Sequence, residues 1–231
     1  NSRQGEGFVA INPEARKKFW LDRKRTAAIS KHTNAFKINE DVVIPLPRMA
    51  EYTDGIERIN IELSLQNKIA LCDSLITFLE QEHLPLGRQE DGSPLESPEL
   101  LAERVDQAIQ MLNSVRQEWA LWLAQIDRFF EDLQSHDLRA SWKVQIRDTL
   151  RTIFTGNAFA PILEECNKIH KQVLKGRVWV ALHMHAGDGN VHTNIPVNSD
   201  DYDMLQSAHG AVKRIMALAR SLDGVVSGEH G

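Results

Sequence analysis

Residues 177–197 read Arg-Val-Trp-Val-Ala-Leu-His-Met-His-Ala-Gly-Asp-Gly-Asn-Val-His-Thr-Asn-Ile-Pro-Val. Apolar positions alternate with other residues on both sides of the Gly-Asp-Gly-Asn sequence at 187–190, and a period of two is typical of a β-strand. Glycine and asparagine tolerate the positive φ that a tight turn between antiparallel strands requires. The stretch therefore predicts a hairpin, with one strand from residue 178 and a return strand over 191–197.

The segments around this hairpin predict an α+β fold. We expect helices over about 12–30, 47–82 and 200–222, and short strands over 42–47 and from Gly224. Strands and helices in this order favour an antiparallel sheet with helices on one face, in ferredoxin-like halves, over a doubly wound parallel sheet.

The middle of the chain predicts a long helical arm. Neither glycine nor proline occurs between Pro98 and Gly156. Apolar residues from Leu101 to Leu133 are spaced alternately by four and three, which is typical of a coiled-coil seam. Helical spacing returns after Trp142. We expect an arm over 85–173, inserted into a sheet domain formed by 8–84 and 174–231.

Composition excludes several classes of protein. The 231 residues are 42% apolar and 26% charged, a globular mixture, and no apolar run is long enough to span a bilayer. Cys72 and Cys166 cannot build a disulfide framework, which favours buried thiols in a reducing, cytoplasmic setting. The basic stretch at 16–25 has the spacing of a solvated helix face, and we expect no nucleic-acid partner.

The hairpin and residues 227–231 hold the residues suited to chemistry. His185 and His192 flank the tight turn and approach each other across neighbouring strands. Ser-Gly-Glu-His-Gly at 227–231 adds the Glu229 carboxylate and the His230 imidazole. Two histidines and one carboxylate commonly hold a catalytic divalent metal. Ordinary surface histidines on a turn are the alternative that spacing leaves open.

These two motifs resemble the C-terminal substrate domain of FAD-linked oxidases, the family of D-lactate, glycolate and D-2-hydroxyglutarate dehydrogenases. Phe-Trp-Leu-Asp-Arg at 19–23, and Phe-Lys at 36–37 ahead of residues 43–47, resemble the early helix and strand of that domain. The likeness covers residues 8–80 and 176–231. The helical arm is absent from typical members and is similar to the large fused versions that carry flavin and iron–sulfur modules.

The resemblance implies an FAD-dependent dehydrogenase of a D-2-hydroxy acid, such as a 2-hydroxyglutarate-like acid, lactate or glycolate. Family positions matching His185, His192 and Glu229 hold a divalent metal, which we expect to be zinc, and this metal lowers the pKa of the substrate hydroxyl. The position matching His230 is the general base, a role that suits an imidazole titrating near neutrality.

The same resemblance implies which residues bind the substrate. Arg23 and Lys37 match positions that hold substrate carboxylates, with solvated helix surface as the alternative. Asn194 shares a strand face with His192 and is expected to complete the substrate shell. We assign packing or a supporting role to His183, and we expect Asp188 to cap its own turn.

We expect the flavin to be bound by a domain outside this sequence, because the sequence contains nothing like the glycine-rich pyrophosphate loop of a flavin domain. We therefore expect a fragment of a larger enzyme that is inactive alone, with FAD on another domain of the same parent chain and an iron–sulfur cluster elsewhere in it. The parent is expected to be cytoplasmic, with peripheral contact to the membrane through electron transfer.

Two other readings of the motifs remain. A metal-dependent hydrolase is one, because His183, His185, Asp188 and His192 superficially resemble the His-x-His-x-Asp-His cluster of zinc hydrolases, although Asp188 lies one residue too late. A helical protein-interaction module, with the arm as its functional part, is the other. The sequence leaves open the specific acid, the identity of the metal, the electron acceptor, the role of the helical arm and the oligomeric state.

Overall fold

The computed structural model describes residues 12–17, 35–88, 97–185 and 187–226. The chain divides into two units, Asn1–Phe36 and Lys37–Gly231. In the first unit, residues 13–17 are helical, and the backbone N–H of Ala15 donates to Oδ1 of Asn12 at 2.8 Å. This bond is the predicted N-terminal cap. Arg23, Glu229 and His230 lie outside the described residues.

Four strands form one antiparallel sheet, in the order β2-β3-β1-β4. Their bounds are β1 Ala35–Val43, β2 Ala181–His185, β3 Asn190–Asn198 and β4 Val225–Val226. Strand β2 pairs with β3, and β1 with β4, in antiparallel register. Two contacts show that β1 and β3 also run in opposite directions: Ile44 N to Gly189 O at 2.8 Å, and Thr193 Oγ1 to Glu40 O at 2.7 Å.

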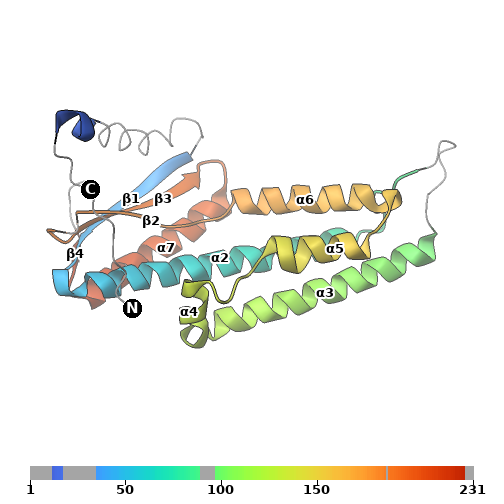
Figure 1. The fold of residues 1–231 in the computed structure, drawn as a ribbon, viewed down its shortest axis with the longest axis horizontal. Helices are drawn as coiled ribbons and strands as arrows, with labels where there is room; N and C mark the ends of the chain where they lie inside the picture. Colours follow the sequence, from blue (N-terminus) through green and yellow to red (C-terminus); the bar gives the residue numbers. More distant parts are fainter. Residues whose placement is uncertain (1–11, 18–34, 89–96, 186, 227–231) are drawn as a thin grey trace. The chain divides into compact units, whose positions relative to one another are not determined.

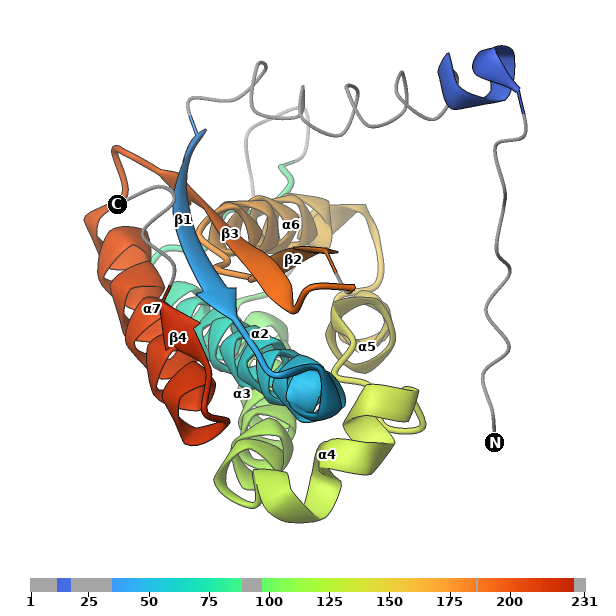
Figure 2. The same cartoon turned by 90° about the vertical axis from the view of Figure 1, so that its left-hand side faces the viewer.

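Two helices complete the ferredoxin-like β-α-β-β-α-β order, α2 (Met49–Leu79) after β1 and α7 (Tyr202–Ser221) after β3. Helix α7 packs against both β3 and α2 (Figure 2). Apolar side chains from the strands and both helices form one buried cluster, which includes Val42, Ile44, Tyr52, Ile56, Val191, Ile195, Ala208 and Ile215. The α+β fold with helices on one face of the sheet is therefore confirmed.

Helix α2 extends beyond the sheet and enters a second buried cluster. Figure 1 shows α3 (Pro98–Ala124) and α6 (Ala160–Lys175) beside it, and α2 packs against both. The bounds of the remaining elements are α4 Ile126–Ser135, the π-helix η3 Trp142–Arg147 and α5 Asp148–Ile153, with 3-10 turns η2 at Leu46–Arg48 and η4 at Asn157–Phe159. Leu63 belongs to the sheet cluster and Leu65 to the arm cluster, so the two cores meet on one helix. The predicted boundary between the sheet domain and the helical arm, at residues 84 and 85, stays a prediction.

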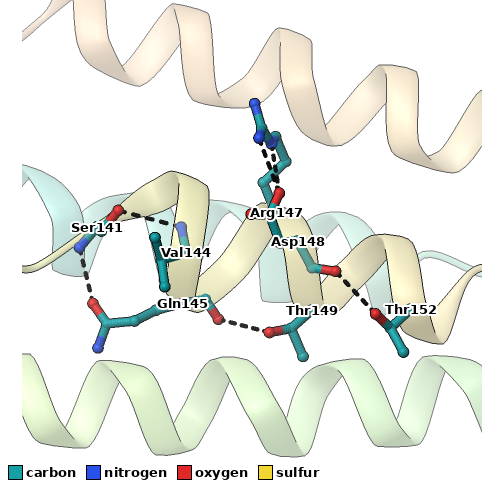
Figure 3. Close-up of polar contacts among 7 residues, drawn as sticks. All are labelled: Ser141, Val144, Gln145, Arg147, Asp148, Thr149 and Thr152. Atoms are coloured by element: carbon teal, nitrogen blue, oxygen red, sulfur yellow. Dashed lines mark hydrogen bonds and ion pairs between the residues drawn. The ribbon is translucent and has the colours of Figure 1, made fainter.

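A network of hydrogen bonds holds the start of η3 and its connection to α5 (Figure 3). The Ser141 hydroxyl accepts a hydrogen bond from the backbone N–H of Val144 at 3.2 Å. The backbone N–H of Ser141 donates to Oε1 of Gln145 at 2.8 Å. The Thr149 hydroxyl then donates to the Gln145 carbonyl at 3.2 Å. The first two bonds pair N–H groups that the start of a helix leaves without backbone partners.

The structure corrects two sequence expectations. The first strand is Ala35–Val43 rather than 42–47, because proline has no N–H to donate and Pro45 and Pro47 lie in or beside η2. The helical seam from Leu101 also breaks at Gln125, whose φ of −114° and ψ of 40° separate α3 from α4. None of the helices that the structure describes is long and apolar enough to cross a membrane.

Candidate active site

The face of the sheet turned away from α2 and α7 is polar. Along β3, Val191, Thr193, Ile195 and Val197 are fully buried, whereas the intervening His192 and Asn194 are only half-buried. Successive side chains of a strand point to opposite faces, so His192 and Asn194 lie together on the face that no described helix covers, which we call the open face. On β1 the same alternation places Lys37, which is exposed, on this face with Asp41.

Three imidazoles gather on this open face. His183 is paired in register with His192, and the ring centroids of these two residues are 6.0 Å apart. The rings of His185 and His192 lie 5.5 Å apart, and those of His183 and His185 lie 5.6 Å apart. The predicted convergence of His185 and His192 is therefore confirmed. His183, given only packing or a supporting role from sequence, belongs geometrically to the same cluster.

A buried carboxylate orients one of these rings. Oδ1 of Asp41 lies 2.6 Å from Nδ1 of His192, and Asp41 is 3% exposed. When a carboxylate occupies Nδ1, Nε2 is the nitrogen left for a metal or a substrate, which is how metal-binding histidines are usually held. Sequence reasoning missed Asp41 because it began the strand at residue 42. The available signal was the alternation of Lys37, Asn39 and Asp41 with Ile38 and Val42.

The hairpin turn requires glycine at one position. Gly189 has φ +77°, and a Cβ there would lie 2.2 Å from the carbonyl oxygen of Ile44. The Gly189 carbonyl in turn accepts from the N–H of Ile44, and the N–H of Asp188 donates to the His185 carbonyl at 3.1 Å. The turn between the two histidines is thus locked against the end of β1, which sets the distance between their rings.

The described residues test only part of the predicted site. His185, His192, Lys37 and Asn194 share the open face, while Arg23, Glu229 and His230 fall outside the described part of the chain. Among the described residues, no group of three His, Cys, Asp or Glu is arranged to hold a metal ion. The metal triad therefore remains a prediction that depends on Glu229.

The donors that are described fit such a metal chemically. Zinc takes imidazole nitrogen readily, and because Nδ1 of His192 contacts Asp41, this ring would bind a metal through Nε2. Oδ1 of Asn190, opposite His185 in register, is buried and accepts no hydrogen bond from any described residue. An orphaned buried acceptor beside two imidazoles suits a site that binds a further group.

The structure defines a ferredoxin-like α+β domain with clustered imidazoles and a buried carboxylate on the sheet face that none of the described helices covers. Residues 2–70 and 146–231 match the model of the family described as FAD linked oxidases, C-terminal domain, and the chain belongs to that family. The unmatched residues 71–145 include α3 and α4 of the helical arm. The family is one of FAD-dependent oxidoreductases, which does not favour the hydrolase reading.

A short stretch of the chain is also similar to a curated protein. It is 40% identical over 47 residues to "Probable D-lactate dehydrogenase, mitochondrial" from Danio rerio. The stretch is 20% of this chain and 10% of that relative, so the match spans about a tenth of the relative's length. No solved structure matches.

Proposed function

We propose that this chain is the substrate domain of an FAD-dependent dehydrogenase that oxidises a D-2-hydroxy acid, either 2-hydroxyglutarate-like, lactate or glycolate. The observation that carries the proposal is the contact of Asp41 with His192 beside the His185 ring, on the open sheet face. Membership of the FAD linked oxidases and the likeness to a D-lactate dehydrogenase support it.

In this proposal His185, His192 and Glu229 hold a divalent metal, zinc. The bound metal lowers the pKa of the substrate hydroxyl and so eases its deprotonation. Asp41 contacts Nδ1 of His192 and so orients the ring for binding through Nε2. The His183 ring lies edge-to-face with the ring of His185 and tilted beside that of His192, and so limits the rotation of both. His230 accepts the hydroxyl proton as general base.

Charged and polar side chains bind the substrate in this proposal. The exposed ammonium group of Lys37, together with Arg23, binds substrate carboxylate. Asn194, on the same strand face as His192, supplies amide hydrogen bonds to the substrate. These side chains would orient the Cα–H of the acid toward the flavin, and FAD, when bound, would supply the hydride acceptor.

The rest of the proposal concerns the larger protein. FAD is carried by a flavin domain of the same parent chain, and an iron–sulfur cluster elsewhere in that parent passes electrons to an acceptor. We place the parent in the cytoplasm, with peripheral contact to the membrane at the electron-transfer step. The helical arm is not part of the metal site, because its core and the sheet core are separate clusters.

The test uses a protein carrying this domain together with its flavin domain. D-2-hydroxyglutarate, D-lactate and glycolate are each supplied with an artificial electron acceptor, and bound metal is measured by mass spectrometry. His185→Ala and His192→Ala should lose metal and at least about a hundredfold in turnover. His209→Ala, at an exposed position on α7, is the matched control and should change neither. Full turnover in a protein carrying both His185→Ala and His192→Ala would refute the proposal.

A further inference from the structure

A cavity lies apart from the histidine cluster. It has a volume of about 570 Å³ and is bounded by α2, by the segment that joins α4 to η3, and by residues 177–179 ahead of β2. None of the open-face residues lines it. Its walls come from both cores, since Asn60 and Ser64 lie where α2 leaves the sheet and Trp142 begins η3.

The walls of this cavity carry excess positive charge. Lys68, Arg139 and Arg177 line it, against a single acidic residue, Glu57. Within the described part of the chain, none of the three cations forms an ion pair or a side-chain hydrogen bond. Burial and the neighbouring charge of Arg177 lower the pKa of Lys68. Lys68 is half-buried, whereas Arg139 and Arg177 are exposed. Cations gathered at one concave surface without acidic partners favour binding of an anion there.

Aromatic groups give the cavity a preformed apolar side. The ring of Trp142 stacks on that of His170 with centroids 4.4 Å apart and an interplanar angle of 6°, which fixes its orientation. Trp179 lines the cavity and is 42% exposed. The side chain of Asn60 bonds both the N–H and the carbonyl of Val180, at 2.8 and 3.0 Å, and so holds the chain beside Trp179.

We propose that this cavity binds an organic anion with two negative charges and a small apolar body. The anionic group lies between Lys68, Arg139 and Arg177, and the apolar body lies against Trp142 and Trp179. Such a ligand contacts α2, the arm and the segment leading into β2 at once, so its binding stabilises the junction of the two cores. A volume of this size suits a small molecule.

A phosphate monoester and a dicarboxylate present the same chemistry, and the experiment separates them. The 231-residue chain is titrated calorimetrically with phenyl phosphate and with glutarate, and its Tm is measured with each compound. Benzyl alcohol is the neutral control. We expect one or both anions to bind and, at about 100 times Kd, to raise the Tm by roughly 5–10 °C. The tighter anion identifies the ligand class.

Variants locate the binding. Lys68→Gln and Arg177→Gln should each weaken the anion at least about tenfold, whereas Lys213→Gln, on the exposed surface of α7, should not. His185→Ala should also leave the affinity unchanged, which separates this site from the proposed catalytic face. The proposal would be overturned if neither anion bound at about 10 mM or if benzyl alcohol bound equally well. Undiminished affinity in both Lys68→Gln and Arg177→Gln would overturn it too.

Discussion

Asp41 and His192 join two strands of the sheet on its open face, with Oδ1 of the carboxylate 2.6 Å from Nδ1 of the imidazole. Because Asp41 is almost fully buried, this contact is shielded from water and fixes the direction of the ring. The contact engages Nδ1 of His192, so a metal bound by this ring would be held through Nε2. It is therefore the first relationship to test in the proposed function.

Asp41→Asn should weaken zinc binding by about 10- to 100-fold, the usual cost of losing the carboxylate behind a ligating histidine. The amide keeps the shape of the side chain but removes the charge that favours one tautomer. Calorimetric titration with zinc measures the change in the protein that carries the complete domain. Glu40→Gln, the neighbouring position on β1, is the control and should bind zinc as the native protein does. Equal affinity in Asp41→Asn would contradict the role given to Asp41.

Gly189→Ala should destabilise the fold strongly, whereas Gly187→Ala should not. Residue 189 has φ +77°, and its new Cβ would lie 2.2 Å from the Ile44 carbonyl oxygen; nothing lies within 4 Å of a Cβ at residue 187. We expect a loss of at least about 1–3 kcal/mol at 189, the usual cost of a strained φ. The change at 187 should stay within about 0.5 kcal/mol. Denaturant unfolding of both variants measures the difference, and equal stability would refute the locked turn.

The hairpin was predictable because its signals are local. Alternating apolar residues and a glycine-rich turn lie within one stretch of chain, and they were enough to place His185 and His192 side by side. The partner of His192 was not predictable in the same way. Asp41 contacts His192 only because strands far apart in the chain lie side by side. The apolar run at 42–47 also led to a predicted strand that begins after Asp41.

The arm shows a similar limit. Apolar spacing correctly identified inward positions such as Leu112 and Trp119, which are fully buried. It did not reveal the break at Gln125, because Ile126 and Leu133 keep the seam spacing and remain buried after the backbone turns. The cationic cavity was also beyond sequence reasoning, since it brings together Lys68 and Arg177 from distant segments.

Lys68→Met should raise the Tm at neutral pH by up to about 2–4 °C. Burial and Arg177 lower the pKa of Lys68 below its usual 10.5, so the folded state binds this proton less tightly than the unfolded chain. The penalty is fully present at neutral pH and disappears as pH rises through the folded pKa toward 10.5. Thermal unfolding at pH 7 and near pH 10 should show the gain shrinking. An unchanged gain, or an equal gain in Lys213→Met, would contradict this account.

Both thiols should resist alkylation in the folded protein. Cys72 and Cys166 are buried, and burial raises the pKa of each to about 12, so thiolate is scarce at pH 8. We expect iodoacetamide at pH 8 to modify neither residue until denaturant is added, and then to modify both. Mass spectrometry of intact protein follows the reaction. Rapid modification of either thiol under native conditions would show that the arm opens readily.

Trp119→Ala should destabilise the arm without altering the histidine cluster. Trp119 is fully buried, and its indole N–H donates to Oε1 of Gln145 at 3.3 Å, so its removal leaves a cavity and breaks a polar contact. The expected loss is about 3–5 kcal/mol in the free energy of unfolding. Leu121→Ala, at a position 47% exposed on the same helix, is the control and should cost under about 1 kcal/mol.

Because the arm core and the sheet core are separate clusters, zinc affinity measured below the unfolding temperature should be the same in both variants. A parallel fall in zinc affinity in folded Trp119→Ala would show that the arm supports the site through α2, the helix that the two cores share.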